Sequence, residues 1–480
     1  MVECYLKSIK IVAFLCTIHG TSPTLSVGLV SFHKFMIFLY NKLNNKKGVD
    51  VMRKFLSITL IMVLIISLVA CGTEKPPVEQ PNTTEPTVET TPTEEVTPTE
   101  PTEVIPPVET AKNKNNMSAA ILDLAYTESQ NNTMFSPLSM DMAMAMVSEG
   151  AGANKTLFNE FLGRDNYAEY AKTYFSYLES LNRESTFSYG GYETVFEIAN
   201  SLWLNKDYNL QNKYTEKVMN YYAELDNLDF IDRATAVKKI NDWANEKTHE
   251  MIPQLLSESD LTEDTKMVVV NAVYFESPWT EPWLVSSNTS TFKKFDESEL
   301  QLNMLKTTNG LYYENEYATA FGATYRNGLQ FIGILPKEEG DFKLQDLDID
   351  SLLASETNKY DVISQMPKFK FDNTIDNLVE HLTELGYGGL FAQDLLPEIA
   401  QEDGKDVSLF ISKIIQADAI ELDENGTKAA AATAIILDKN AAFIEPPETK
   451  EVILDRPFAF LIYDPQMEQI VFMGKVVDPS

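Results

Sequence analysis

Residues 423–438, DENGTKAAAATAIILD, constrain the fold most, because this segment suits two different structural environments. Gly426 can adopt backbone angles that are closed to other residues, so it can act as a pivot. Four consecutive alanines follow it at 429–432. Alanines favour a helix in isolation and are depleted in strands, but small side chains also suit a segment that slides between two packed strands.

In a sheet, this segment would separate its small and apolar side chains from its charges. Alternate residues of a strand face opposite sides of the sheet. Lys428 and Asp438 fall on the outer face. The inner face is formed by Thr427, Ala429, Ala431, Thr433, Ile435 and Leu437. The sequence therefore predicts a loop that can become a buried strand.

Composition suits a globular protein and excludes some functions. The chain has 480 residues, of which 44% are hydrophobic and 23% charged. Its formal net charge of −32 argues against nucleic acid as a partner, because phosphates need a basic surface. The cysteines are Cys4, Cys16 and Cys71, so neither a disulfide nor a cysteine-ligated metal can hold the later part of the chain together.

Residues 52–71 indicate export. A secretory signal begins at Met52, with Arg53 and Lys54 before the apolar stretch 55–69. It closes with LVAC at 68–71, which resembles a bacterial lipobox and implies cleavage before Cys71 and lipidation of its sulfur. We interpret residues 52–70 as a lipoprotein signal peptide and residues 1–51 as an upstream extension that is not translated or is dispensable. A transmembrane anchor is the alternative, but the apolar stretch is shorter than the ~20 residues of a span.

A change in composition separates a stalk from a globular domain. Residues 71–115 comprise Cys71 and a segment rich in Thr, Pro and Glu, which favours extended, solvated chain. Residues 116–480 form the predicted domain. Its predicted helices are 117–126, 137–148, 167–181, 213–223, 234–250 and 374–385. Its predicted strands are 196–204, 267–275, 329–335, 362–371, 409–422, 459–463 and 469–475. Helices early and strands late predict an α+β fold with a large mixed sheet.

Enzyme signatures are missing from the sequence. We find no Gly-x-Ser-x-Gly elbow, Walker loop or dinucleotide-binding glycine pattern. The domain offers His249 and His381 as its histidines. Glu246 and His249 have the spacing of two metal ligands on one face of a helix. The sequence contains no second pair with this pattern, so we interpret them as surface ion-pairing residues. We expect no catalytic residue, metal or cofactor.

The domain resembles the serpin family over residues 116–480. Ordered stretches match the family pattern, and the ordered set is far more specific than any one match. They are NTMFSPLS at 132–139, IANSLW at 198–203, Asp229 and Phe230, INDW at 240–243, Lys247 and Thr248, Ile252, VNAVYF at 270–275, Trp279, PKF at 367–369, Leu385 and Gly386, ENGTKAAAAT at 424–433, DRPF at 455–458 and FMG at 472–474.

This resemblance implies a serpin fold, with helices packed on large mixed sheets and an exposed reactive-centre loop. It implies inhibition of serine or cysteine endopeptidases: a protease cleaves the loop, forms a covalent complex, and is trapped when the loop inserts as a new strand. We also expect a monomer. The lipobox-like residues at 68–71 imply that it lies outside the cell, tethered to a bacterial membrane through Cys71. The alternative is a non-inhibitory serpin that acts as a cell-surface binding or chaperone-like module.

The resemblance also assigns site residues. The hinge residues are Glu424, Gly426, Thr427, Ala429, Ala430, Ala431, Ala432 and Thr433. Lys428 departs from the acidic residue that is common there. The residues that control sheet opening are Ser136, Ser139, Asn271 and Gln416, with Trp279 near the top of the sheet. Gln416 stands where many members carry histidine.

The reactive bond is less well defined. Counting from Gly426 as in the family places it at Asn440–Ala441. A trypsin-like pocket would favour Lys439–Asn440 instead, and Phe443 would suit a chymotrypsin- or subtilisin-like protease. Counting back from Pro457 leads to Glu445, which indicates a longer loop than usual.

Overall fold

The computed structural model describes residues 114–187, 194–309, 311–427 and 447–480, which belong to one compact unit, Glu100–Ser480. Several predicted site residues lie outside the described residues. They are the predicted lipidation site Cys71, the predicted hinge residues Ala429 to Thr433, and the reactive-bond candidates Lys439, Asn440, Ala441 and Phe443.

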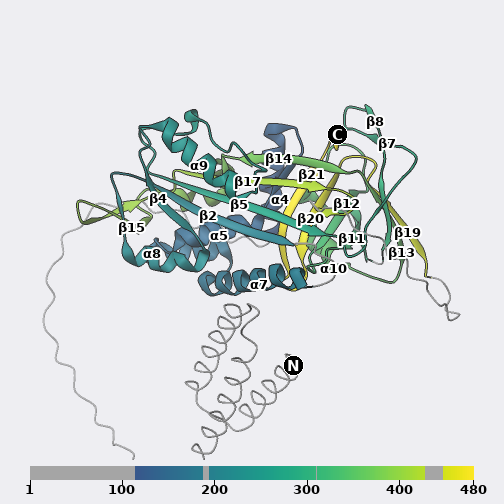
Figure 1. The fold of residues 1–480 in the computed structure, drawn as a ribbon, viewed down its shortest axis with the longest axis horizontal. Coiled ribbons are helices and arrows are strands. Elements are labelled where there is room, and N and C mark those ends of the chain that lie inside the picture. Colours follow the sequence, from purple (N-terminus) through teal and green to yellow (C-terminus); the bar gives the residue numbers. More distant parts are fainter. Residues whose placement is uncertain (1–113, 188–193, 310, 428–446) are drawn as a thin grey trace, which may run out of the picture. The chain divides into compact units, whose positions relative to one another are not determined.

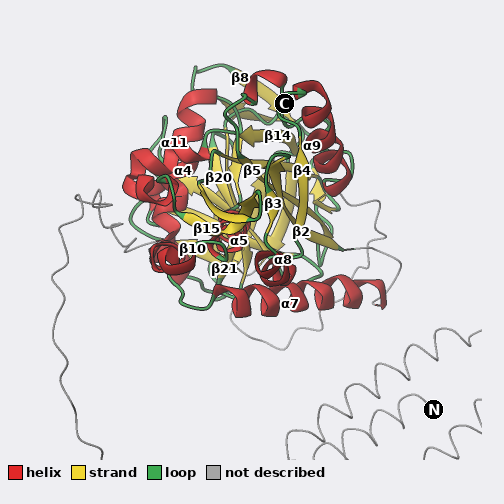
Figure 2. Ribbon diagram, turned by 90° about the vertical axis from the view of Figure 1, so that its left-hand side faces the viewer, coloured by secondary structure: helices red, strands yellow, loops and turns green. Residues whose placement is uncertain are grey.

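Helices surround the strands (Figure 2). Among the described residues, the α-helices are α4 (Lys114–Ser129), α5 (Pro137–Ser148), α6 (Lys155–Leu162), α7 (Tyr167–Phe187), α8 (Asn212–Val218), α9 (Arg233–Lys247), α10 (Ile349–Ala354) and α11 (Leu378–Leu382). None of the helices in these ranges is long and apolar enough to cross a membrane.

A mixed sheet runs through the molecule (Figure 1). In the described ranges its order is β14 (Phe369–Ile375), β17 (Lys413–Leu422), β18 (Gly426–Thr427), β5 (Met267–Pro278), β2 (Val195–Asn205) and β4 (Glu224–Leu228). β5 is buried along almost its whole length, as its largely apolar sequence predicts for a strand that is covered on both faces.

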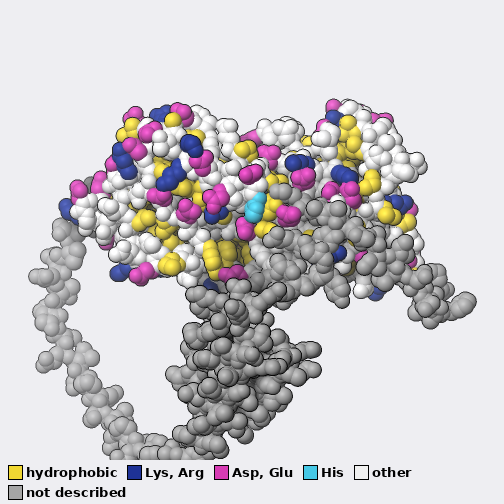
Figure 3. Space-filling view, viewed as in Figure 1, with side chains coloured by type: hydrophobic (Ala, Val, Ile, Leu, Met, Phe, Trp, Pro, Cys, Tyr) yellow, Lys and Arg dark blue, Asp and Glu magenta, His cyan; other side chains and the backbone are white. Residues whose placement is uncertain are grey.

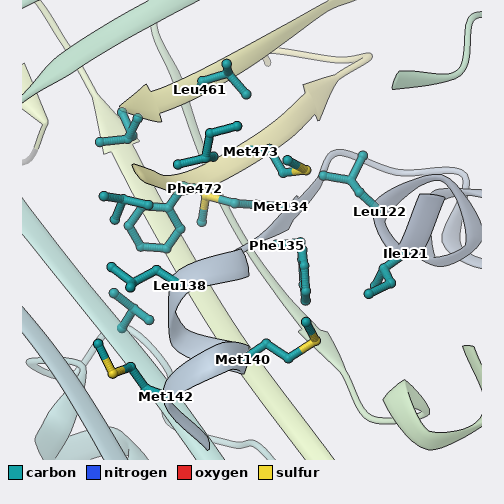
Figure 4. Close-up of a cluster of buried hydrophobic side chains, with 14 of the residues drawn as sticks. Ile121, Leu122, Met134, Phe135, Leu138, Met140, Met142, Leu461, Phe472 and Met473 are labelled. Carbon is teal, nitrogen blue, oxygen red and sulfur yellow. The ribbon is translucent and has the colours of Figure 1, made fainter. Parts of the chain in front are cut away.

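A second sheet packs with α5 against the inner face of the mixed sheet. Its described strands are β1 (Thr133–Phe135), β21 (Gln469–Val476), β20 (Phe458–Asp464), β12 (Gln330–Pro336), β11 (Ala318–Thr324) and β10 (Leu311–Glu314). Every residue of α5 is buried. Figure 4 shows part of the core that α4, β1, α5 and the second sheet share, with Ile121, Leu122, Met134, Phe135, Leu138, Met140, Met142, Leu461, Phe472 and Met473.

Smaller sheets complete the described strands. They are β19 (Thr449–Ile453), β13 (Asp361–Met366), β9 (Leu305–Asn309) and β6 (Leu284–Val285) in one sheet, β16 (Lys405–Leu409), β15 (Leu396–Glu402) and β3 (Asn209–Leu210) in another, and the hairpin of β7 (Ser290–Lys293) and β8 (Glu299–Leu302).

Helix α9 covers the outer face of the mixed sheet. Trp243 and Ile240 of α9 share an apolar cluster with Trp203 of β2, Val270 of β5 and Ile415 of β17. The indole rings of Trp203 and Trp243 meet edge to face with centroids 6.2 Å apart. On the surface, acidic and basic side chains are interspersed over the face in Figure 3.

The α+β class is confirmed, but the elements differ from the prediction in several places. Short strands such as β4, β11 and β15 were not predicted, and the helix predicted at 213–223 ends at Val218.

Three further predicted elements have a different form. Residues 362–371 form two strands, β13 and β14, in different sheets, because Pro367 lacks the N–H that a continuous ladder needs. Residues 409–422 are also two elements, since Leu409 ends β16 and β17 begins at Lys413. The apolar run hides this break because the connecting Ile411 is also buried.

The third difference concerns the helix predicted at 374–385. Thr374 and Ile375 remain in β14, where they pair with Ala417 and Gln416, so strand pairing overrides the local helical pattern. α11 begins at Leu378 and continues into a single wider turn, Thr383–Tyr387, in which Gly386 has a φ of 95°.

Candidate functional site: the hinge and the closed sheet beneath it

The chain that leaves β17 returns to the same sheet almost at once. Residues 413–418 of β17 run parallel to residues 268–273 of β5 and pair with them directly. Further along, β18 lies between the two strands and is antiparallel to both. Thr427 pairs with Leu422 on one side and with Ser277 on the other. The first hinge residues are therefore already seated where a new strand would begin.

The turn before β18 depends on Asp423 and Gly426. The Asp423 carboxylate accepts hydrogen bonds from the backbone N–H groups of Asn425, at 2.7 Å, and Gly426, at 3.3 Å. Gly426 has a φ of 154°, and a Cβ there would lie 2.3 Å from the carbonyl oxygen of Ser277. A side chain cannot fit without moving backbone, so this position requires glycine for both conformation and space.

Thr427 occupies a closed aromatic pocket on the inner face. It is 1% exposed, and its hydroxyl is hydrogen-bonded to the Tyr325 hydroxyl at 2.7 Å. Tyr325 stacks on Trp279 with centroids 4.2 Å apart and meets Phe275 edge to face. Burial raises the pKa of Tyr325 well above its ordinary value, so its hydroxyl keeps its proton. The pocket accepts a small hydroxylated side chain and leaves no water to solvate a charge.

Two tryptophans and one lysine anchor the turn. Trp279 donates from its indole Nε1 to the Asp423 carbonyl at 3.0 Å and from its backbone N–H to the Asn425 carbonyl at 2.8 Å. The backbone N–H of Trp283 donates to the Glu424 carbonyl at 2.9 Å. The Lys368 ammonium pairs with the Glu424 carboxylate and lowers its pKa. Trp279 thus lies where the resemblance placed it, in direct contact with the hinge.

A polar network brings the predicted sheet-opening residues together below the hinge. Gln416 of β17 accepts from the backbone N–H of Ser136 at 3.0 Å and donates to the Ser136 carbonyl at 2.9 Å. Asn271 of β5 accepts from the Ser139 hydroxyl and donates to the Asn200 side chain at 2.8 Å. Gln416 also donates to Asn271 at 3.4 Å, so the network crosses from β17 to β5.

This network closes the sheet at the point where a longer insertion must open it. Gln416 and Asn271 are direct partners in the parallel ladder. Both side chains are 1% exposed, and the Ser136 hydroxyl donates to the Val471 carbonyl of the second sheet at 2.7 Å. Glutamine supplies the donor and the acceptor that the position needs. Separating the strands would leave these buried groups without partners until a new strand replaced them.

Sequence reasoning missed Tyr325 and Trp283 beside the hinge, and it also missed Asp418. Asp418 is fully buried at the last pair of the ladder, opposite Val273, and neither carboxylate oxygen has a hydrogen-bond partner among the described residues. Burial raises its pKa well above the ordinary value, so the carboxyl is held neutral. The sequence did carry a signal for Asp418. It is an acidic residue on the inner face of a largely apolar strand, two residues after Gln416.

Glu246 and His249 both make surface ion pairs, as predicted, although not with each other. The Glu246 carboxylate lies 3.8 Å from the Lys247 ammonium group. His249 lies just beyond α9, and its Nε2 is 3.2 Å from the Glu197 carboxylate of β2. Its ring stacks on Tyr274 of β5, with centroids 4.1 Å apart. Within the part of the chain that the structure describes, no group of three potential ligands could hold a metal ion.

We expect Gly426→Ala to lower the stability of the protein by about 1–3 kcal/mol, because the new Cβ collides with backbone and the residue has positive φ. Thermal unfolding, together with tryptophan fluorescence as a probe of Trp279, measures the effect. Gly404→Ala is the control, since Gly404 also has positive φ, at 76°, but a Cβ added there would meet nothing within 4 Å. An equal loss in both variants would contradict the role of close packing.

We expect Asp418→Ala to stabilise the native form by about 1–3 kcal/mol at pH 7.5 and by less at pH 4. The unfolded chain releases this proton near pH ~3.9, whereas the native state retains it. The native state therefore loses stability as pH rises above about 4, and the variant removes that loss.

Thermal unfolding of the uncleaved protein across this pH range measures the effect. Asp372→Ala is the matched control, because Asp372 is an exposed carboxylate on the neighbouring strand β14. A gain for Asp418→Ala that does not change with pH would show that Asp418 is not held neutral.

Comparisons with known proteins agree with this geometry. The family model described as serpin (serine protease inhibitor) matches residues 112–479. A serpin-like protein of Methanosarcina acetivorans is 30% identical over 379 residues, which cover 76% of this chain and 86% of that protein. Human neuroserpin is 28% identical over 377 residues, covering 74% of this chain and 88% of its own length.

A solved structure supports the same assignment. Tengpin, a thermophilic serpin in its native state, superposes with a TM-score of 0.62 at 27% identity, covering 77% of this chain and 96% of its own. The ordered motifs, the mixed sheet with its seated hinge, and these matches lead to one conclusion. The chain belongs to the serpin family.

Proposed function

We propose that this protein inhibits serine or cysteine endopeptidases as a suicide substrate. One observation carries the proposal: Gly426 and Thr427 already lie between β17 and β5, in register with both strands. A loop seated in this way needs no change of direction to continue into the sheet. Only the parallel ladder below it has to open.

The register at Thr427 defines where the following residues would lie. Each further residue pairs with one residue earlier on β17 and one earlier on β5. Thr433 then falls between Gln416 and Asn271, where its hydroxyl can replace the contact that joins these two amides. The inserted strand would therefore satisfy the network that it separates.

Apolar contacts add to the gain from insertion. In the same register, Ile435 falls between Ile414 and Val269, which both face the inner core. One parallel ladder is exchanged for two antiparallel ladders, which adds about a dozen hydrogen bonds of ~0.5–1.5 kcal/mol each. The gain is on the order of 10 kcal/mol, so the native state is held by a kinetic barrier.

Inhibition uses this stored free energy. The protease nucleophile attacks the carbonyl carbon of the reactive bond, and the following residue leaves as a free amine, which gives an acyl-enzyme. Insertion then moves the acyl group away from the hinge and distorts the protease before water can hydrolyse the ester or thioester. We retain Asn440–Ala441 as the reactive bond, with Lys439–Asn440 as the alternative, because extra chain beyond the inserted strand would relieve that distortion.

We also propose that the protein acts outside the cell as a lipoprotein anchored to a bacterial membrane through Cys71. The support for this is the signal-like stretch at 52–70, the lipobox-like residues before Cys71 and the stalk that follows. Mass spectrometry of the membrane-extracted protein tests this proposal. It should show a lipid-modified cysteine at the mature amino terminus.

The decisive experiment mixes the purified protein with trypsin-, chymotrypsin- and subtilisin-type proteases. A covalent band that survives SDS, with release of a C-terminal peptide, supports inhibition, and the mass of that peptide identifies the reactive bond. Clean cleavage by every protease without a covalent band would overturn inhibition and favour the non-inhibitory binding or chaperone-like role.

We expect Thr427→Arg to convert the inhibitor into a substrate. Arginine cannot occupy the closed pocket of Tyr325 and Trp279, so insertion stalls while the reactive bond stays available to the protease. The measurement is the ratio of SDS-stable complex to cleaved chain. Thr427→Ser keeps a small hydroxyl and should behave as the parent protein. Undiminished complex formation by Thr427→Arg would refute the insertion mechanism.

A further inference from the structure

Three carboxylates gather on the outer face of the mixed sheet beside the hinge. The Tyr274 hydroxyl of β5 donates to the Glu276 carboxylate at 2.6 Å. Burial raises the pKa of Tyr274, and the negative charges of Glu276, Glu197 and Glu421 raise it further. These carboxylates come from β5, β2 and β17, so the group spans both sides of the position that β18 begins to fill.

The three carboxylates differ in their cationic partners. Glu197 faces His249, and Glu421 pairs with Lys370, its neighbour on β14, at 2.9 Å. Among the described residues, no lysine, arginine or histidine makes an ion pair with Glu276. One side of the opening thus carries a carboxylate that already has a cation, and the other side carries one that lacks a cation.

The register of β18 indicates which residue would meet them. Thr427 lies between Leu422 and Ser277. If the strand were extended in this register, the next residue would pair with Glu421 on one side and Glu276 on the other. That residue is Lys428, the position where the hinge departs from the family pattern. In a strand, Lys428 faces outward, on the same side as both carboxylates.

We propose that Glu276 and Glu421 form the receiving site for the Lys428 ammonium group. Lys428 is then the residue that determines the register in which loop insertion begins. This inference rests on the proposed function. Directly opposed side chains in antiparallel strands have Cβ atoms ~4.5–5.5 Å apart, within the reach of a lysine. Insertion then produces a row of alternating charge, Lys370, Glu421, Lys428 and Glu276, across four adjacent strands.

The same geometry explains why an acidic residue would not suit this hinge. A carboxylate at position 428 would lie directly between two others, and like charges opposite one another destabilise strand pairing. It would do so at the first step beyond Thr427, before the later residues of the loop contribute. The charge at this position therefore acts on the start of insertion.

The test uses the full chain and three variants: Lys428→Glu, Glu276→Lys, and the double variant that exchanges the two charges. A chymotrypsin-type protease cleaves the loop after Phe443, and mass spectrometry identifies the cleaved form. None of the substitutions creates a new site for this protease. The appearance of a more thermostable cleaved form over time measures insertion, and the uncleaved forms are unfolded in parallel as folding controls.

We expect each single variant to insert roughly fivefold more slowly than the parent, and the charge exchange to restore the rate to within about twofold. High salt should reduce the defect of the single variants. Lys405→Glu is the control for net charge, because Lys405 is exposed on β16, away from the mixed sheet, and this variant should insert at the parent rate.

Each outcome decides one of the two proposals or both. A defect in Lys428→Glu that the charge exchange does not relieve, in a parent that inserts normally, overturns the receiving site alone. Normal insertion with charge rescue, but without a covalent complex with any protease, overturns inhibition and supports the receiving site. A parent chain that gains no thermal stability on cleavage overturns both.

Discussion

The parallel ladder between β17 and β5 holds the mixed sheet closed beneath β18. It joins residues 413–418 of β17 to residues 268–273 of β5, while β18 lies between the later residues of the two strands. The side chains that would oppose its separation are buried and mutually satisfied, with Gln416 and Asn271 linked to α5. Opening the ladder would leave these groups buried without partners. The free-energy cost of such an unpaired buried group exceeds the net contribution of one hydrogen bond to folding. A barrier of this kind can hold a less stable state for long times.

The two faces of this ladder are covered by different elements. The inner face rests on α5, whose residues are all buried, so it offers a rigid support. The outer face is lined by Ala417 and Ala419 and covered by the α9 cluster, in which Trp243 meets Trp203. A wider sheet must shift this cluster, and small side chains beneath it reduce the apolar contact that is lost. Widening the sheet therefore has to move the apolar cluster around α9 on one face and the contacts with α5 on the other.

The sequence predicted the long buried elements, such as α5 and β5, because their apolar patterns are local. It did not predict the short strands β4, β11 and β15, whose formation depends on pairing with the neighbouring strands of their sheets. The site residues came from the ordered family motifs and not from local patterns. α5 has the predicted bounds, and Thr427 faces inward as the alternation required. The sequence could not show that Gly426 and Thr427 are already seated, since this depends on carbonyl contacts with Trp279 and Trp283. The two backbone N–H contacts leave no trace in residue identity, and the indole contact of Trp279 requires two segments that are distant in the sequence to meet.

In the insertion that we propose, the two faces of the segment that begins at Gly426 would together specify its register. On the inner face, the pocket of Tyr325 and Trp279 accepts Thr427 and excludes charge. On the outer face, Glu276 and Glu421 attract a cation at the next position. A slip by one residue would bring Lys428 into the aromatic pocket and Thr427 between the carboxylates, and both exchanges are unfavourable. Small residues alone, such as the alanines at 429–432, would slide without a preferred register. In the proposed insertion, Lys428 supplies the preference for one register, at the position where insertion begins.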